Sequence, residues 1–220
     1  MAEINLLNSL PKGKRSLNAR KDKDLYIEIS KKFGQMYFDG PREYGYGGYK
    51  YDGRWKTVAK DIISHFNLKK GDKLLDVGCA KGFLVKDLLE LGIDAYGIDV
   101  SEYAILNCEP EVIGRLQIGS ADSLPFPDNS FSAVVAINSI HNLSKERCIK
   151  AVKEIERISP GKGFIQVDSY HTEIQKRIFE SWVLTAEFYD YPDGWVKLFN
   201  EAGYTGDWYW TIFDSEGNNI

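Results

Sequence analysis

A turn of small residues stands at the centre of the chemistry that this sequence could perform. Gly78, Ala80 and Gly82 alternate with larger residues directly after the apolar run 73–77, and a helical pattern begins at Phe83. Small residues at these positions let the backbone bend sharply and let a ligand lie against it. In α/β domains, a strand that breaks into such a turn and then a helix is where a nucleotide-like ligand binds.

The charge beside the turn narrows the kind of ligand. Asp76 stands two residues before Gly78, where it would repel a pyrophosphate and attract a cation such as an ammonium or a sulfonium. The dinucleotide fingerprint G-x-G-x-x-G/A also fails, because Phe83 takes its last small position. The turn therefore predicts a cationic, nucleotide-like cofactor and disfavours NAD.

Two further acidic residues follow in a fixed order. Asp99 ends a second apolar run about 20 positions after the turn, where a carboxylate can accept hydrogen bonds from both ribose hydroxyls. Asp122 lies in the loop 119–126, after a short third strand at 116–118. Each residue alone could equally be a cap or a turn former, but the whole succession favours cofactor binding.

The pattern Asp76-x-Gly78-x-Ala80-x-Gly82 resembles the first motif of the class I S-adenosylmethionine-dependent methyltransferases, in particular the small-molecule "type 11" group. That group usually has glycine where this chain has Ala80. The resemblance spans residues 55–213 and implies S-adenosylmethionine as cofactor and S-adenosylhomocysteine as product.

The resemblance also implies a set of cofactor contacts. In the family, an acidic residue of the loop after the third strand meets the adenine amino group, and Asp122 matches that position. The remaining contacts fall on the turn, the end of the second strand, the same loop and the end of the fourth strand. The full expected set is Asp76, Gly78, Cys79, Ala80, Gly82, Asp99, Val100, Ala121, Asp122, Ser123 and Asn138.

Three residues on the acceptor side are candidates for catalysis. His141 follows the fourth strand (133–137), Asp168 ends the fifth, and His171 comes shortly after. A base is needed only if the accepting atom carries a proton, and imidazole titrates near neutrality, so His141 is the first candidate. A buried structural histidine remains an equal alternative. We expect no metal, because these residues lie on separate elements without ligand spacing.

The segment 40–54 alternates glycine with tyrosine in a way that suits neither a helix nor a strand. We interpret it as a lid, since its glycines permit folding over a ligand and its tyrosines bring flat faces with a polar tip. The alternative is a surface loop that covers the sheet. Arg54 or Arg42 could pair with a carboxylate of the cofactor or of an anionic acceptor. The expected lid or substrate residues are Tyr44, Tyr46, Tyr49, Tyr51 and Arg54.

The apolar runs and helical periodicities alternate along the chain and predict an α/β fold. We expect a Rossmann-like, doubly wound sheet, mostly parallel, with helices on both faces and, from the resemblance, an antiparallel C-terminal edge strand. The expected organisation is an N-terminal helix and lid segment (1–54), a methyltransferase domain (55–213) and a flexible tail (214–220). Residues 183–190 fit either a helix or a strand.

Composition limits the partners. The net charge of −4 and the sequence pI near 5.5 disfavour nucleic acid, although a basic stretch lies at 12–23. Three cysteines, with no signal peptide and no membrane-length apolar run, predict a cytoplasmic protein without a disulfide framework. We expect a monomer or a homodimer and no membrane partner.

The preferred function is methyl transfer to a polar small molecule such as a sugar, a nucleotide-activated precursor or a secondary metabolite, on oxygen more than on nitrogen. An RNA or protein methyltransferase and a non-catalytic domain that binds S-adenosylmethionine or NAD are the alternatives.

Overall fold

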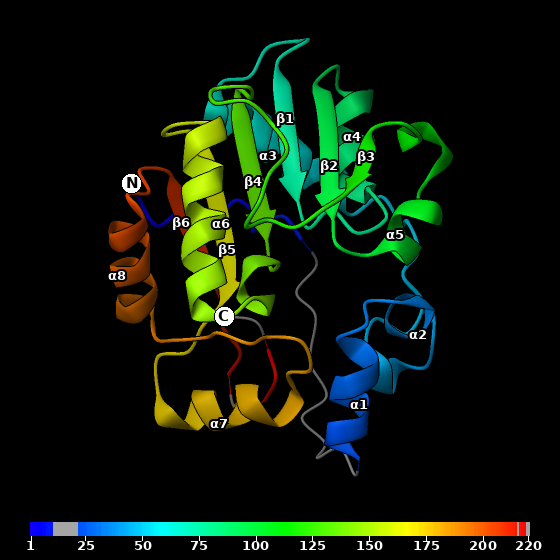
Figure 1. The fold of residues 1–220 in the computed structure, drawn as a ribbon, viewed down its shortest axis with the longest axis vertical. Coiled ribbons are helices and arrows are strands. Elements are labelled where there is room, and N and C mark those ends of the chain that lie inside the picture. Colours follow the sequence, from blue (N-terminus) through cyan, green and yellow to red (C-terminus); the bar gives the residue numbers. More distant parts are fainter. Residues whose placement is uncertain (11–21, 215, 219–220) are drawn as a thin grey trace.

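The computed structural model describes residues 1–10, 22–214 and 216–218, and the basic stretch at 12–23 falls almost entirely outside them. Within these residues six strands form one sheet in the order β3-β2-β1-β4-β5-β6, and every neighbouring pair is parallel (Figure 1). The strands are β1 (Lys73–Val77), β2 (Asp94–Asp99), β3 (Leu116–Ile118), β4 (Ala133–Ile137), β5 (Gly163–Asp168) and β6 (Asp207–Thr211).

The prediction of an antiparallel C-terminal edge strand is wrong. β6 pairs with β5 in parallel, with Phe164 beside Asp207 and Asp168 beside Thr211. The chain leaves β5, forms two helices, α7 (Glu173–Trp182) and α8 (Pro192–Ala202), and returns to the end of the sheet at which β5 begins. Such a helical crossover produces a parallel pair, whereas a tight hairpin would have produced an antiparallel one.

Helices cover both faces of the sheet. On one face α3 packs beside α4, and on the other α6 packs beside α8, and each pair shares a continuous apolar cluster with the strands (Figure 1). The other helical elements are α1 (Lys23–Ser30), α2 (Gln35–Phe38), η1 (Arg42–Tyr44), α3 (Trp55–Phe66), α4 (Phe83–Glu90), α5 (Glu102–Leu106), η2 (Pro110–Val112), η3 (Ile140–Asn142) and α6 (Lys145–Ile158).

Two segments far apart in the sequence lie beyond the carboxyl ends of the strands. In Figure 1 the arrowheads of the strands point toward α1 and α2 on one side and α7 on the other. The helix α7 ends at Trp182, and residues 183–190, expected to be a helix or a strand, form neither. Because ligands of open parallel sheets bind outside the carboxyl ends of the strands, these segments frame the place where a site is expected.

The first residues of the chain lie along β6. The amide of Trp208 donates to the carbonyl of Ala2 (3.1 Å), and the amide of Ile4 donates to the carbonyl of Trp208 (2.9 Å). The Trp210 indole also donates to Glu3 (2.8 Å). Residues 2–4 thus pack on the sheet, although the sequence groups them with the lid.

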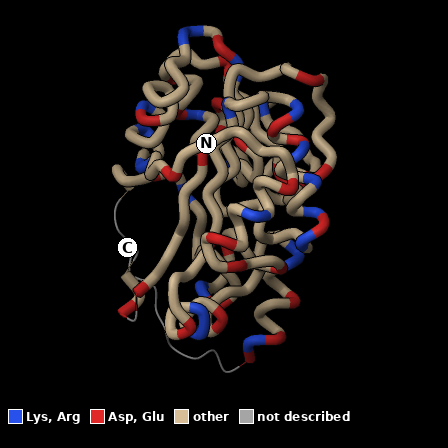
Figure 2. Tube along the Cα trace, turned by 90° about the vertical axis from the view of Figure 1, so that its left-hand side faces the viewer, with Lys and Arg blue, Asp and Glu red and all other residues tan. Residues whose placement is uncertain are grey.

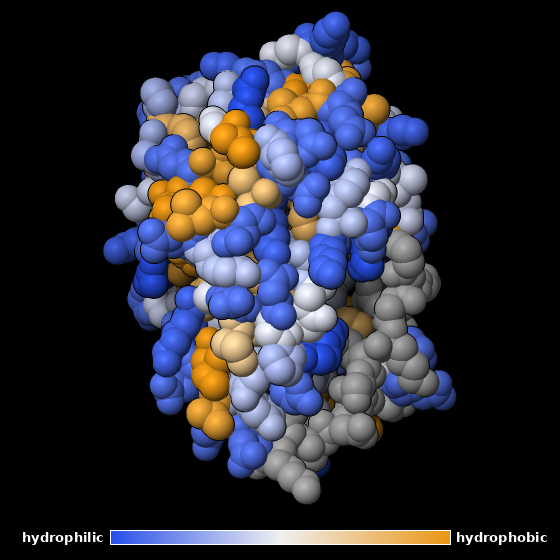
Figure 3. Space-filling view, turned by 90° about the vertical axis from the view of Figure 1, so that its right-hand side faces the viewer, coloured by the Kyte–Doolittle hydropathy of each residue, from blue (hydrophilic) through white to orange (hydrophobic). Residues whose placement is uncertain are grey.

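Figure 2 shows positions of Lys and Arg interspersed with positions of Asp and Glu along the chain, so neither positive nor negative charge predominates in that view. Exposed apolar side chains gather on the face that carries α5 and β3 (Figure 3). Among the exposed residues of that region are Leu106, Ile113 and Ile118. Within the described ranges, none of the helices has the length and apolar character needed to cross a bilayer.

Candidate functional site

The small-residue turn adopts a backbone that its residues permit and larger ones would not. Gly78 has φ +83°, and a Cβ there would lie 2.2 Å from the Cβ of Ser139. Gly82 has φ +77°, and a Cβ there would lie 2.8 Å from a methyl carbon of Leu116. Ala80 also takes a positive φ of 50°. The close approach of Ser139 and the left-handed conformation together explain why Gly78 is glycine.

Asp99, at the end of β2, holds the turn in place. One of its oxygens accepts the amide N–H of Ala80 (2.8 Å) and the other accepts that of Ser101 (2.8 Å). Burial raises the pKa of this carboxyl group, and the bonds from the backbone amides partly oppose the rise. Each oxygen still has a lone pair, so Asp99 could also accept hydroxyl groups of a ligand.

Asp76, in β1, presents a different environment. Its side chain is buried, with a relative exposure of 5%, and it accepts no hydrogen bond from any described residue. Burial, reinforced by the nearby charge of Asp99, raises the pKa of Asp76 to about 7. A buried carboxylate without a partner is costly, so this group suits a cationic ligand that would supply the missing bond.

Two adjoining cavities open at the carboxyl ends of the strands. The smaller, of about 100 Å³, is lined by Asp99, Val100 and Ala121 together with aromatic rings from the α1–α2 region. The larger, of about 730 Å³, contains the carboxylates of Asp76 and Asp168. Gly78 and Ala80 line both.

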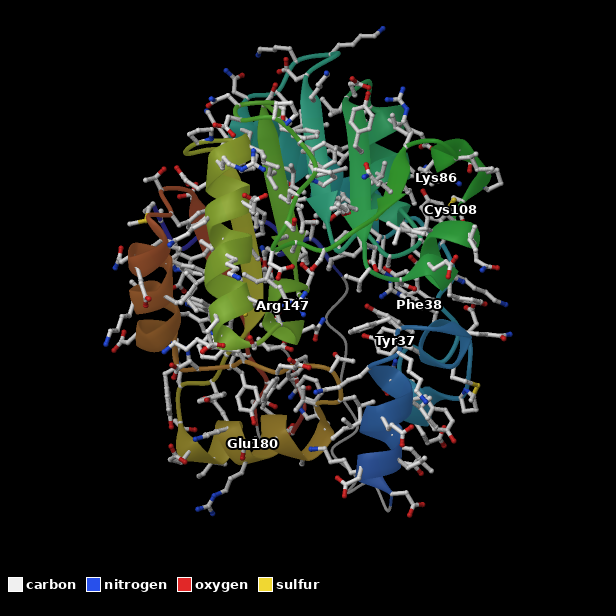
Figure 4. The ribbon with its side chains drawn as sticks, in the orientation of Figure 1. Tyr37, Phe38, Lys86, Cys108, Arg147 and Glu180 are labelled. Carbon is white, nitrogen blue, oxygen red and sulfur yellow. The ribbon has the colours of Figure 1, made fainter. Side chains whose placement is uncertain are left out.

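The cavities fit the two ends of S-adenosylmethionine. The smaller has an apolar wall and the Asp99 carboxylate, which suit a nucleoside. The larger offers the unpartnered Asp76, which suits an ammonium group. Figure 4 shows Tyr37 and Phe38 rising from α2 toward the end of the sheet, and both rings line the smaller cavity. Sequence reasoning missed these rings.

Asp122 and Ser123 do not line either cavity. The Asp122 carboxylate accepts two hydrogen bonds from Arg147 of α6, with an Nε–Oδ2 distance of 2.7 Å, and a third from the Ser120 hydroxyl. This ion pair lowers the pKa of Asp122 to about 2. The neighbours Ser120 and Ala121 are the residues of this loop that reach the cavity.

His141 and Asp168 meet on the floor of the larger cavity. His141, in η3, is 4% exposed, and its Nδ1 accepts the backbone N–H of Asp168 (3.2 Å). An Nδ1 that accepts leaves the proton on Nε2, which lies 3.5 Å from the Asp168 carboxylate. Both nitrogens of the imidazole are thus directed at Asp168.

A polar chain crosses the floor beside this pair. The Gln166 amide donates to the Thr211 hydroxyl (2.9 Å), which donates to the Asn138 side chain (3.0 Å). The side-chain oxygen of Gln166, Oε1, has no hydrogen-bond partner in the described part of the chain, although the residue is only 3% exposed. Asn138 was predicted for the cofactor, but Gln166 and Thr211 were not. The sequence offered one signal for Gln166, since it is a polar residue inside the apolar run 164–168.

The lid tyrosines divide into two groups. Tyr46 and Tyr49 line the larger cavity, and the Tyr49 ring stacks on Phe83 with centroids 4.6 Å apart. Tyr44 packs instead against Tyr26 of α1, and the Tyr51 hydroxyl donates to Asp87 of α4 (2.5 Å).

The basic residues of the lid stand at the mouth of the larger cavity. Arg54 lines it but is held by the carboxylate of Asp52, its own near neighbour. Arg42 donates to the carbonyls of Gly45 and Tyr46 (2.7 and 2.9 Å). These cations therefore shape the lid as well as the charge of the entrance.

Two remaining predictions concern His171 and Cys79. His171 is exposed and lies outside both cavities. Cys79 lines the larger cavity, and burial raises the pKa of its thiol far above the usual range, which makes it a poor nucleophile. No cluster of three or more metal-ligating side chains occurs among the residues that the structure describes.

Comparisons with known proteins agree with this geometry. Residues 75–166 match the sequence profile of the family described as "Methyltransferase domain". A demethylmenaquinone methyltransferase of Symbiobacterium thermophilum is 26% identical over 69% of this chain and 76% of its own length. A Mus musculus protein named "Probable tRNA methyltransferase 9B" is 34% identical over 51% of this chain, which spans only 25% of that relative.

Among solved structures, a Haloferax volcanii methyltransferase in complex with the Trm112 methyltransferase activator superposes with a TM-score of 0.56. The match covers 84% of this chain and 77% of that one, at 20% identity, so it bears on the fold alone. The turn, the sheet order and the matching family lead to one conclusion. Residues 75–166, a little under half of the chain, carry a methyltransferase domain, and its match supports a class I enzyme with S-adenosylmethionine as cofactor.

Proposed function

We propose that this methyltransferase transfers a methyl group to a hydroxyl oxygen of a polar small molecule. The observation that carries the proposal is the buried His141–Asp168 pair on the floor of a cavity of about 730 Å³, next to the cofactor turn. When bound, S-adenosylmethionine supplies a methyl group on a positively charged sulfur. The protein's task is then to hold the accepting oxygen in line with that group and to receive its proton.

Asp168 is the proposed proton acceptor. Its carboxylate oxygens meet only the His141 Nε2, at 3.5 Å, among the interactions of the described residues, so lone pairs remain for a substrate hydroxyl. The His141 Nδ1 is already used by a backbone amide, which moves the proposed base from the histidine to its neighbour. His141 then acts as a positioning residue, because its Nδ1 holds the Asp168 backbone amide and its Nε2, 3.5 Å from the carboxylate, can stabilise the charge there.

Cofactor binding is proposed to divide between the two cavities. Asp76 would bind the amino group of the methionine part, and Asp99 the ribose hydroxyls. The turn residues Gly78, Cys79, Ala80 and Gly82 would lie against the cofactor, with Val100, Ala121 and Asn138 around it. Asp122 and Ser123 would contribute through the shape of their loop, since Arg147 holds the Asp122 carboxylate.

The relative named as a tRNA methyltransferase makes RNA the competing acceptor. The entrance offers RNA few cations, because Asp52 holds Arg54 and the other basic side chains of the lining there are Arg42 and Lys50, while Asp76 and Asp168 add negative charge inside. Long nucleic acids are bound chiefly through phosphate contacts with unpaired Lys and Arg. The size and depth of the cavity agree with a small molecule.

The test begins with calorimetry of S-adenosylmethionine, S-adenosylhomocysteine and NAD. We expect the first two to bind and NAD to give no heat. Purified protein with S-adenosylmethionine is then incubated with a metabolite extract and, separately, with bulk tRNA, and a mass gain of one methyl group is sought. Methylation of tRNA without any small-molecule product, or binding of NAD alone, would overturn the proposal.

A further inference from the structure

The segment 183–190, which follows α7, forms part of the wall of the larger cavity. Trp182, at the end of α7, and the next three residues, Val183, Leu184 and Thr185, line this cavity. In Figure 1 the segment, drawn in orange, runs between α7 and the carboxyl ends of the strands. Thr185 therefore brings a hydroxyl group to a mainly apolar wall.

The Thr185 hydroxyl is enclosed but unbonded. The residue is only 9% exposed. Its oxygen keeps accessible surface and makes no hydrogen bond with the described residues. Because Thr185 lines the larger cavity, the accessible part of its side chain faces that space. An enclosed hydroxyl in an apolar wall is costly unless something bonds to it, so this group marks a place for a polar atom of a ligand.

A second threonine of the same cavity shows the contrast. The Thr211 hydroxyl accepts the Gln166 amide (2.9 Å) and donates to the Asn138 side chain (3.0 Å). Its donor is used within the protein. The Thr185 hydroxyl can still donate one hydrogen bond and accept others.

The segment that carries Thr185 is also bonded to the backbone of the proposed catalytic pair. Two residues after Thr185, the amide N–H of Glu187 donates to the His141 carbonyl (2.9 Å). The amide of Phe188 donates to the same oxygen (3.1 Å). These two bonds hold Thr185 at a fixed place beside the helical turn η3, which carries His141.

A further contact extends this connection to Asp168. The Phe188 ring packs against that of Trp195 in α8, with centroids 4.8 Å apart. The Trp195 indole donates to the carbonyl oxygen of Asp168 (3.2 Å). The Thr185 hydroxyl does not bond to the Asp168 carboxylate, whose partner among the described residues is His141. The two groups can therefore hold different parts of one ligand.

We propose that Thr185 binds the methyl acceptor, through a hydrogen bond between its hydroxyl and a polar group of the acceptor away from the reacting oxygen. This inference rests on the proposed function, since it assigns a further contact in the same site. Asp168 meets the hydroxyl that is methylated, Thr185 meets the second polar group, and the apolar side chains before Thr185 pack against the body of the molecule. Thr185 takes no part in the bonds that form and break.

The first test compares Thr185→Val, which has nearly the same shape but no hydroxyl, with Thr185→Ser, which keeps the hydroxyl. The substrate is whichever component of the metabolite extract or of the tRNA gains the methyl group. We expect Thr185→Val to raise the KM for it roughly tenfold, because one hydrogen bond is lost. The turnover number and S-adenosylhomocysteine affinity should not change, since the contact is the same before and during transfer. Thr185→Ser should stay within about threefold of the wild type.

The matched control is Ser159→Ala. It removes a hydroxyl that is also buried and unbonded among the described residues, but Ser159 follows α6 and lies outside both cavities. It should leave the KM at the wild-type value. Melting temperatures of all variants show whether any of them is destabilised.

The second test does not depend on turnover. Thr185→Cys is treated with methyl methanethiosulfonate, and labelled peptides are quantified by mass spectrometry. The new thiol should react faster than the buried Cys79 and Cys148. The metabolite extract, with S-adenosylhomocysteine present, should slow labelling at position 185 relative to Cys108, which lies outside both cavities and serves as the internal reference.

An unchanged KM in Thr185→Val, or a loss in Thr185→Ser as large as that in Thr185→Val, would overturn the inference. So would a thiol at position 185 that does not react or that the extract does not protect. Methylation of tRNA alone, or of nothing, would count against the proposed function instead. The KM comparison with tRNA in the first case, and the protection of position 185 in the second, would still decide the role of Thr185.

Discussion

Two carboxylates of the site, at the ends of neighbouring strands, have opposite hydrogen-bond environments. Asp99, at the end of β2, receives two backbone amides, whereas Asp76, in β1, receives no hydrogen bond from the described residues. At the end of β2 the carboxylate already holds the turn through these amides, and each oxygen keeps a lone pair for the ribose hydroxyls. At β1 the carboxylate has no partner among the described residues, so a cationic ligand could supply one.

The difference separates residues that hold the structure of the site from residues that bind a ligand there. Substituting a satisfied buried group leaves its partners unpaired and should lower stability. Substituting an unsatisfied one removes a strain and should raise stability while function is lost. The predictions below test whether the two regions obey this division, from the largest expected effect to the smallest.

The largest effect is expected on the acceptor side. Asp168→Asn should reduce the turnover number by ~10²–10⁴, the usual contribution of a positioned base, and should change S-adenosylmethionine affinity only slightly. Rates are measured with the acceptor found in the metabolite screen, and affinity by calorimetry. The control is His171→Ala, which alters an exposed residue outside both cavities.

His141→Ala separates a base from a positioning residue. If Asp168 receives the proton, the His141 variant should retain more activity than Asp168→Asn and should still show the wild-type dependence on the acidity of the acceptor hydroxyl. A His141 variant as inactive as Asp168→Asn, with a lost imidazole titration in the rate profile, would return the role of base to the histidine.

Asp76→Asn should make the protein more stable while it weakens cofactor binding. The pKa of Asp76 is raised from 3.8 to about 7, so between these pH values the folded state holds a proton that the unfolded state has lost. Stability therefore falls as pH rises through this window, by up to ~4 kcal/mol, and the penalty persists above it. Relative to wild type, the variant should be more stable at pH 8 and little changed at pH 4.

Binding by the same variant should move in the other direction. Loss of a charged hydrogen bond to the cofactor's amino group should weaken S-adenosylmethionine by roughly tenfold to a hundredfold. In the wild type, affinity should increase from pH 6 to pH 8 as Asp76 loses its proton. Denaturant titrations and calorimetry at several pH values measure both effects. A variant that is less stable at pH 8 would contradict the comparison.

Asp99→Asn should lower stability and affinity together. An asparagine offers one acceptor oxygen where Asp99 has two, so the amide of Ala80 or of Ser101 loses its partner. The expected cost is about 1–3 kcal/mol in the free energy of unfolding, with weaker cofactor binding because the turn relaxes. Unchanged stability with lost affinity would show that Asp99 binds the ligand without holding the turn.

These residues also mark how far the sequence could be interpreted. The strands, the turn and the acidic positions follow from local patterns, so β1 to β5 and the glycine positions lie where the sequence predicts them. The direction of β6 does not, because it depends on how the chain crosses the sheet after β5. Motif spacing placed Asp76 and Asp99 in the site but could not show that only one of them would find partners.

Side-chain partners from distant elements could not be predicted from the sequence, because they also depend on how the chain folds. Arg147 lies 25 positions from Asp122, and Tyr51 lies 36 positions from Asp87, yet these pairs decide where Asp122 and Tyr51 point. Gln166 could have been found, since a polar residue in a fully buried run asks for an explanation.

The smallest effect concerns the lid. Lys81, in the cofactor turn, bonds to the Asp39 carboxylate (2.6 Å) and to the carbonyl of Tyr49 (3.2 Å), so it joins the turn to the segment 40–54 by a hydrogen bond, beside the stacking of Tyr49 on Phe83. Lys81→Met should loosen that segment without unfolding the protein, because the pair is only partly buried. We expect hydrogen exchange at residues 45–50 to accelerate by roughly 3–10-fold, a local opening worth ~1 kcal/mol.

In the wild type, S-adenosylhomocysteine should slow exchange in the same segment, because a ligand under Tyr46 and Tyr49 gives their rings a further surface to cover. Lys86→Met is the control: its amine is equally buried and paired, with Glu109 and Glu111, and it touches the segment only at the Tyr51 ring (4.3 Å to the centroid), outside residues 45–50. If both lysine variants accelerate exchange alike, the effect is general loosening of α4. If neither does and the ligand changes nothing, the segment is a fixed cover of the sheet. The distinction between structural and ligand-binding groups would then apply to the cavity residues and not to the lid.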